Sequence, residues 1–265
     1  MKIDEILTAL WADYVSLTPQ ADKIHALLAA RGEAIVNDHV ALRTFDCAGG
    51  LAALAAPFEA VGYVCAADRY RFADKKLNAR YWKHPDPARP KLFISELCTR
   101  ELSTGAQQII DALVAQLPAA YLQRADLPWA GRPWACTRAQ YETLLAESEY
   151  AAWMAAFGFR VNHFTVLVNA LTTFADLPAL NAFLIAHSFT LNAAGGVIKG
   201  TPSDHLEQSS TLADRVPVEL AGEMVSLPSV YYEFAKRYPL ANGELFAGFV
   251  PTSADKIFES TNAKA

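Results

Sequence analysis

The spacing of hydrophobic and polar positions changes several times along the chain, and each change predicts a different element. Apolar residues recur every three or four positions from Ile3 to about residue 30, which predicts amphipathic helices ending at Gly32. From Ala34 the texture becomes that of a strand, with alternating polar and apolar positions after Asp38. Residues 50–61 are rich in Ala and Leu and are expected to be helical.

Further strand-like runs fall into two groups, separated by a stretch rich in Trp and Tyr that is expected to be helical over 104–156. In the first group, strands are expected around residues 63–65, 79–83 and 91–97. The second group begins at Phe159 and includes a helix over 177–187, with Asp176 as its N-cap. Its later strands are expected around residues 196–199, 208–212, 216–220 and 229–234.

Both groups read as strand, helix and further strands, which predicts an α+β fold of two βαβββ halves. The parts are expected at 1–33 (helices), 34–100 (first half), 101–158 (helical insertion), 159–250 (second half) and 251–265 (tail). With no Pro/Ser/Gly-rich linker, the 265 residues are expected to form one unit. At residue level the repeat is weak, since the two halves share little more than a histidine after a polar residue.

Composition and charge narrow the function. The formal net charge is −5 and Lys and Arg are scattered, which gives no footprint for nucleic acid or an anionic membrane. The four cysteines form no CxxC pair, so neither a disulfide framework nor a thiolate zinc site is indicated. No apolar run approaches the ~20 residues that span a bilayer, and the start is acidic. We expect a cytoplasmic protein with a small-molecule partner; the oligomeric state is not predicted.

Strand phase singles out candidate metal ligands. Side chains two positions apart share a face of a strand, so His39 and Arg43 point the same way. His163 lies on the first strand of the second half, and Glu233 lies among aromatic residues, where an ionised carboxylate requires a compensating cation. Two imidazoles and one carboxylate form the facial triad of non-haem Fe(II) sites. His39, His163 and Glu233 are therefore candidate ligands.

Each candidate also has an ordinary structural explanation. A histidine in a strand is more often a core or surface residue than a ligand. Glu233 has Lys236 and Arg237 nearby in the sequence as salt-bridge partners, and Arg43 alone is usually an ion-pairing residue. Glu96 competes with Glu233 for the carboxylate role, and the sequence does not decide between them.

Several motifs together resemble the 2-oxoadipate dioxygenase/decarboxylase family. They are Asn37-Asp-His-Val-Ala-Leu-Arg-Thr-Phe45, Phe93-Ile-Ser-Glu-Leu97, Ser148-Glu-Tyr-Ala-Ala-Trp153, Val161-Asn-His-Phe-Thr165, Gln208-Ser-Ser-Thr211 and Tyr231-Tyr-Glu-Phe-Ala-Lys-Arg237. The similarity spans roughly residues 34–237, and the chain looks like one of the shorter members. The resemblance implies a fold related to the vicinal oxygen chelate (glyoxalase-like) superfamily, with a metal in the cup of a curved, mixed or antiparallel sheet.

The resemblance also implies roles for particular residues. Carried over position by position, the metal ligands fall on His39, His163 and Glu233. Arg43 would hold the substrate's carboxylate and act in catalysis, and Gln208 and Ser210 are further expected substrate contacts. The implied cofactor is Fe(II), and the implied reaction converts 2-oxoadipate and O2 to 2-hydroxyglutarate and CO2.

Two other functions are compatible with these residues. The same fold and ligands could bind Zn(II), Mn(II) or Ni(II) and catalyse an isomerase, lyase or hydrolase reaction without O2, because fold does not fix function. The other is a non-catalytic protein that sequesters a small molecule, although the presence of two histidines and a carboxylate weighs against it. The insertion with Trp129, Trp134 and Trp153 is expected either to pack in the core or to cover the cup.

Overall fold

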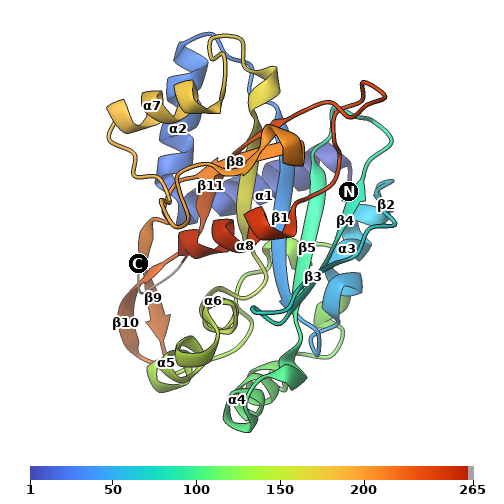
Figure 1. Ribbon diagram of the computed structural model, residues 1–265. Helices are drawn as coiled ribbons and strands as arrows, with labels where there is room; N and C mark the ends of the chain where they lie inside the picture. Colours follow the sequence, from blue (N-terminus) through green and yellow to red (C-terminus); the bar gives the residue numbers. More distant parts are fainter. Residues whose placement is uncertain (262–265) are drawn as a thin grey trace.

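A nine-stranded mixed sheet forms the centre of the molecule (Figure 1), and the computed structural model describes residues 1–261. Its spatial order is β2-β4-β5-β1-β6-β11-β8-β7, with β3 paired to β4. The strands are β1 (Asn37–Phe45), β2 (Val64–Cys65), β3 (Tyr70–Phe72), β4 (Leu77–Lys83), β5 (Lys91–Leu97), β6 (Val161–Leu167), β7 (Lys199–Thr201), β8 (Leu206–Ser210) and β11 (Tyr231–Arg237). A separate ribbon pairs β9 (Arg215–Leu220) with β10 (Glu223–Pro228).

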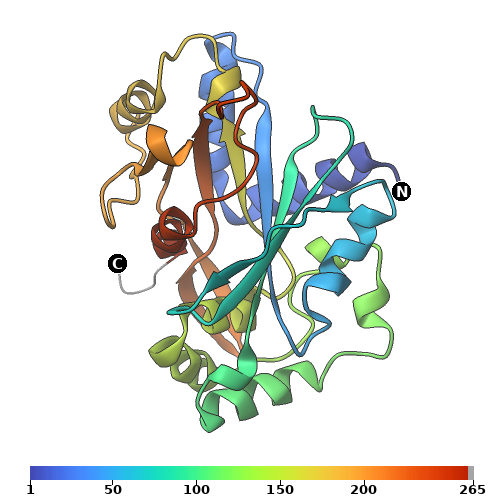
Figure 2. The same ribbon diagram turned by 45° about the vertical axis from the view of Figure 1, so that its right-hand side comes forward.

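The sheet consists of two halves with the same topology. β1 and β6 run antiparallel at the centre; β5 is parallel to β1, and β11 is parallel to β6. Farther out, β4 and β8 run antiparallel to these neighbours, and β2 and β7 follow them. The sheet is curved (Figure 2). The predicted α+β fold of two βαβββ halves around a curved mixed sheet is confirmed.

Helices surround the sheet. The α-helices are α1 (Ile3–Leu17), α2 (Pro19–Ala30), α3 (Gly50–Glu59), α4 (Thr104–Val114), α5 (Arg138–Glu147), α6 (Glu149–Phe157), α7 (Leu177–Ala186) and α8 (Pro251–Ile257). Short 3₁₀ helices are η1 (Thr99–Glu101), η2 (Tyr121–Gln123), η3 (Leu127–Trp129), η4 (Val168–Ala170), η5 (Pro202–Asp204) and η6 (Phe258–Thr261). Among the described residues, none of these helices is long and apolar enough to cross a bilayer.

The predicted caps explain where two helices begin or end. The Asp176 carboxylate accepts a hydrogen bond of 2.8 Å from the backbone N–H of Ala179, which starts α7. Gly32, just after α2, has a φ of +86°, a conformation that favours glycine. Two strands were not predicted, β3 and β10. The β9–β10 hairpin turns at Ala221 and Gly222, both with positive φ, and an alanine there gives little turn signal.

The two faces of the sheet are covered differently. In Figures 1 and 2, α1 and α8 lie on opposite sides of the sheet. Trp11 and Tyr14 of α1 pack on Phe164 of β6, with ring centroids 5.1 and 5.0 Å apart. The neighbours of Phe164 in the strand, His163 and Thr165, point to the other face because side chains alternate. This other face is the concave one and carries the candidate ligands.

The tryptophans of the helical insertion pack in the core or against it. Trp134 belongs to the buried core, where its ring stacks on Phe45 at 6.1 Å. Trp129 is half-buried against the same core. Trp153 of α6 is also buried in the core, and the guanidinium of Arg43 lies 5.1 Å from the centroid of its ring. The expected tail contains α8 and η6, which cover the concave face; residues 262–265 lie outside the described part of the chain.

Candidate metal centre

His39 reaches the concave face from β1 and is oriented by its neighbour Asp38. The His39 Nδ1 lies 2.8 Å from Asp38 Oδ1, although consecutive residues of a strand normally face opposite ways. A β-bulge explains the contact, since Asn37 and His39 on β1 oppose consecutive residues of β6 and leave Asp38 unpaired. The other ring nitrogen, Nε2, lies 3.1 Å from the Thr165 hydroxyl, which can donate to it.

Asp38 is held as an anion by Arg237. Arg237 donates Nε and Nη2 to the two oxygens of Asp38, at 2.5 and 2.8 Å, and Lys91 Nζ is 3.7 Å away. Burial alone would raise the pKa of Asp38, but the charge and hydrogen bonds of Arg237 lower it well below its usual value. An ionised carboxylate can only accept, so His39 carries its proton on Nδ1 and presents the lone pair of Nε2.

His163 repeats this arrangement on β6 with a neutral partner. Its Nδ1 is 3.0 Å from the amide oxygen of Asn162, and its ring stacks on Tyr231 at 4.6 Å. Ala41 and Leu42 on β1 oppose His163 and Val161, so Asn162 also sits in a bulge. Burial lowers the pKa of both histidines, and that of His163 falls well below its usual value. Neutral imidazole is the form that binds metal.

Glu233 of β11 is the third member and is almost fully buried. Gln208 donates Nε2 to Glu233 Oε1 at 2.6 Å, whereas Oε2 has no hydrogen-bond partner among the described residues. Burial raises the pKa of Glu233 to about 8, although the hydrogen bond from Gln208 acts in the opposite direction. A buried carboxylate with an orphaned oxygen is costly unless a cation compensates it, so the site suits a metal.

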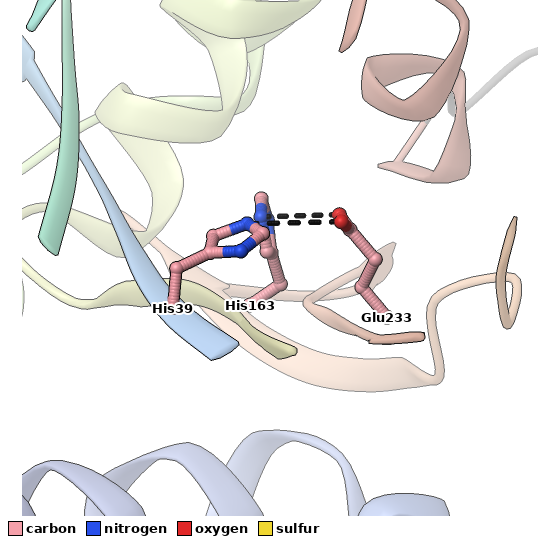
Figure 3. Close-up of side chains that lie close together, drawn as sticks. All are labelled: His39, His163 and Glu233. Atoms are coloured by element: carbon pink, nitrogen blue, oxygen red, sulfur yellow. Dashed lines mark ion pairs between the residues drawn. The ribbon is translucent and has the colours of Figure 1, made fainter. Parts of the chain in front are cut away.

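The three side chains point toward one another (Figure 3). His39 Nε2 lies 3.6 Å from Glu233 Oε1, and His163 Nε2 lies 3.3 Å from Glu233 Oε2. One ligand atom from each residue can be chosen so that all lie within 4.8 Å of one another. These separations leave room for an ion between the atoms after small side-chain adjustments. The structure thus brings the candidate ligands together from the adjacent strands β1, β6 and β11.

The structure supports neither Glu96 as the carboxylate ligand nor a salt bridge between Glu233 and Arg237. Glu96 lies on the opposite face of the sheet, where its Oε2 accepts a hydrogen bond of 3.0 Å from the backbone N–H of Leu51 in α3. Ser95 is paired with Arg43 and shares its face of the sheet, so the next residue, Glu96, points to the other face. Arg237, considered as a salt-bridge partner of Glu233, instead pairs with Asp38.

Arg43 is buried on the same face of β1 as His39, four residues further along the strand. Its Nη1 lies 3.3 Å from a Glu149 carboxylate oxygen, and its Nη2 donates to the Thr261 hydroxyl at 3.3 Å. Its guanidinium lies 4.9 Å from the ring centroid of Tyr150, and its Nε has no hydrogen-bond partner among the described residues. A delocalised cation among aromatic rings and with a free donor suits a carboxylate ligand.

The expected substrate contacts differ in position. Gln208 lines the cavity at the triad, but its amide nitrogen is used by Glu233; its Oε1 remains without a partner among the described residues. Ser210 does not line that cavity, and its hydroxyl lies 2.8 Å from that of Ser260 in η6. The cavity encloses about 20 Å³, which is room for about one water molecule or ion.

Several residues of the site were missed by reasoning from the sequence. Asp38 and Asn162 orient the histidines, and the only available signal was a polar residue immediately before each histidine. Phe249 precedes α8 and packs edge-on against His39, with ring centroids 4.9 Å apart. No motif indicated Phe249, because its contact depends on how the chain returns over the sheet.

The curved mixed sheet of two similar halves defines the class of fold, which is glyoxalase-like. A glyoxalase-superfamily protein from Ralstonia eutropha shares this fold, with a TM-score of 0.71 and 23% identity over 92% of this chain and 84% of that one. At this identity the likeness concerns the fold alone.

Comparison with known proteins defines the family. The model of the 2-oxoadipate dioxygenase/decarboxylase family matches residues 5–125 and 127–246. The chloroplastic 2-oxoadipate dioxygenase/decarboxylase of Arabidopsis thaliana is 33% identical over 280 residues, covering 94% of this chain and 74% of that protein. The chain therefore belongs to the 2-oxoadipate dioxygenase/decarboxylase family.

Two crystal structures are similar over nearly the whole chain. A protein from Shewanella frigidimarina has a TM-score of 0.90 and 47% identity, covering 94% of this chain and 98% of that one. Hydroxyglutarate synthase from Oryza sativa, solved in complex with 2-oxoadipate, has a TM-score of 0.91 and 33% identity, covering 98% and 92%.

Proposed function

We propose that this protein is a non-haem Fe(II)-dependent dioxygenase that converts 2-oxoadipate and O2 to 2-hydroxyglutarate and CO2. The observation that carries the proposal is the convergence of two neutral imidazoles and an orphaned carboxylate oxygen at His39, His163 and Glu233. The names of the relatives supply the reaction, and the rice structure with 2-oxoadipate supports the substrate class. His39, His163 and Glu233 would hold Fe(II), and the bound ion would supply the oxygen chemistry on O2 and a 2-oxo acid.

Arg43 is proposed to bind a carboxylate of the substrate. Its aromatic surroundings exclude water, which strengthens a charge-assisted pair with a carboxylate. Binding requires Arg43 to exchange its contacts with Glu149 and Thr261 for the substrate. A fixed substrate presents one particular C–H bond for oxidation, which is the advantage of a rigid, forked donor over lysine.

The other residues of the site are proposed to orient the ligands and exclude water. Gln208 fixes the Glu233 carboxylate, and the Asp38–Arg237 pair fixes the His39 ring. Phe93, Phe249, Ile257 and Phe258 form the apolar wall of the cavity. Ser210 can contact substrate only if its hydrogen bond with Ser260 is exchanged.

We also propose that residues 1–265 act as one catalytic unit. A cytoplasmic location is proposed as well, and the two plant relatives are named as plastid proteins.

Oxygen consumption tests the proposal. Protein loaded anaerobically with Fe(II) and then given 2-oxoadipate and O2 should consume O2, release CO2 and form 2-hydroxyglutarate in equal amounts. The same protein loaded with Zn(II) should consume none. Turnover of a 2-oxo acid without O2 uptake would instead support a metal-dependent isomerase, lyase or hydrolase, and tight binding without turnover would support a sequestering protein.

A further inference from the structure

Phe258 separates two cavities on the concave face. One is the cavity of about 20 Å³ at the triad, and the other is an outer pocket of about 180 Å³ whose lining includes Lys76, Glu149 and Tyr150. Phe258 is the residue common to both linings. The inner cavity holds about one water molecule or ion, which is several times too small for a dicarboxylic 2-oxo acid.

The Phe258 ring also lies against Arg43, with the guanidinium 5.6 Å from the ring centroid. His39 and Arg43 share one face of β1, and the residue between them on that face is Ala41, whose methyl group fills little space. The Phe258 ring thus borders the cavity at the triad and also contacts Arg43, the two features proposed to hold the substrate. A molecule large enough to contact both would compete with this ring for space, because the cavity beside it has room for only about one water molecule.

The segment carrying Phe258 is fastened by contacts that can be exchanged. In η6, the Ser260 hydroxyl lies 2.8 Å from that of Ser210, and the Thr261 hydroxyl donates to Glu149 at 2.6 Å. Each such hydrogen bond contributes about 0.5–3 kcal/mol, and water can take its place when the segment moves outward. The Phe258 ring itself packs edge-on against Phe72, with centroids 5.5 Å apart. Asn192 also donates Nδ2 to the Ser260 hydroxyl at 2.9 Å, and the backbone N–H of Ala213 donates to the Ser260 carbonyl at 3.0 Å. None of these contacts belongs to the backbone pairing of the central strands, so η6 can move without breaking that pairing.

We propose that Phe258 is the gate and the specificity-determining residue of this site. Its ring moves out of the space between the ligands and Arg43 to admit a 2-oxo acid from the outer pocket. Its size then limits the length of acid that fits when η6 closes. The identity of the acid rests on the proposed function, whereas the separation of the two cavities does not.

Chain-length preference is the first test. Phe258→Ala should raise kcat/KM for 2-oxopimelate relative to 2-oxoadipate by at least about tenfold, because one methylene in an apolar pocket changes discrimination by roughly 10–200-fold. Phe258→Leu should change the ratio in the same direction by less, and it serves if the alanine variant folds poorly. Phe72→Leu is the matched control, since Phe72 packs on the same ring but neither cavity lining includes it.

Metal extraction is the second test and needs no turnover. From full-length protein loaded with Co(II), a chelator should remove the ion at least about tenfold faster in Phe258→Ala than in wild type, with unchanged equilibrium affinity. Phe72→Leu should behave as wild type. Extraction rate and length preference that both stay at wild-type values in Phe258→Ala and Phe258→Leu would overturn the gate. If wild type holds metal but does not oxidise any 2-oxo acid, the proposed function fails while the extraction rates still decide on the gate.

Discussion

The two halves of the sheet share a backbone arrangement and differ in the side chains that it carries. β1 pairs with β5 as β6 pairs with β11, which makes His39 equivalent to His163 and Phe93 equivalent to Glu233. In each half a bulge turns the residue before the histidine inward. The second half supplies two candidate ligands and the first supplies one, together with Arg43. The repeated backbone arrangement therefore positions the site. The differences at single residues place the candidate metal ligands mainly in the second half and Arg43, the proposed substrate contact, in the first.

The residues that orient the histidines diverge in charge. Asp38 is an ionised carboxylate clamped by Arg237, whereas Asn162 is a neutral amide whose Nδ2 has no hydrogen-bond partner among the described residues. A carboxylate behind an imidazole increases its basicity more than an amide does. The two histidines are thus equivalent in position but should differ in their strength as ligands.

Removing a ligand from either half should have the largest effect. His39→Ala, His163→Ala and Glu233→Ala should each reduce bound metal from about one ion per chain to under about a tenth, because two ligands cannot retain the ion. Elemental analysis of freshly purified protein measures this. His187→Ala, at an exposed residue after α7, is the control and should keep its metal. Full metal in both histidine variants would refute the proposed ligands.

Arg43 should separate substrate binding from metal binding. Arg43→Ala should lower kcat/KM by roughly 10²–10³-fold while metal content stays unchanged, since losing one partner of a buried charge pair costs about 2–5 kcal/mol. Arg43→Lys should recover only part of the loss. Leu167→Ala changes the equivalent position of the second half, at the end of β6, and should change kcat/KM little. Similar losses in the two alanine variants would contradict this division of roles.

Substituting the residues that orient the histidines, Asp38 and Asn162, tests the difference between the halves. Asp38→Asn should weaken metal binding by about 10–100-fold, because it removes the carboxylate behind His39 and leaves Arg237 without its anion. Asn162→Ala should weaken it by less than tenfold. Competition with a chelator of known affinity measures both variants. Equal losses would show that the charge of Asp38 has no special role.

The smallest expected effect concerns a link between the halves that is remote from the site. Glu33, just before β1, accepts hydrogen bonds from Thr172 and Thr173, which follow β6. Burial would raise the pKa of Glu33, but these hydrogen bonds lower it to about 2. Glu33→Gln should therefore lower the free energy of unfolding at pH 7 by about 1.5 kcal/mol.

The effect of Glu33 should depend on pH with a definite sign. Because its pKa is lower in the folded state, its contribution is fully present above about pH 4.5 and disappears as the pH falls toward 2. Urea unfolding of wild type and Glu33→Gln at pH 7, 5 and 3.5 should show a difference that shrinks at the lowest pH. A difference that grows on acidification would refute the assignment.

Strand alternation predicted much of this arrangement, and its limits are also physical. It placed His39 and Arg43 on one face, but it could not choose between Glu96 and Glu233. That choice depends on which strands become neighbours and in what register, and register is not a property of a single strand. The bulges were invisible for a similar reason, since strict alternation would turn Asp38 and Asn162 away from the histidines that they orient.

The C-terminal region shows a second limit. The order of helices and strands was predictable because each has its own periodicity. α8 and η6 are too short to show a periodicity, so the sequence does not indicate which surface their apolar residues pack against. The contacts of Phe249 and Phe258 with residues of β1 follow from the return path of the chain. Such contacts are fixed by tertiary packing and leave no local pattern.

The antiparallel seam between β1 and β6 has a consequence for heat stability. An ion shared by His39, His163 and Glu233 would cross-link three neighbouring strands that are distant in sequence, on both sides of that seam. Such an ion binds the native chain in preference to the denatured one, so the melting temperature should climb with its free concentration. Melting and release of the ion should then occur as a single cooperative event.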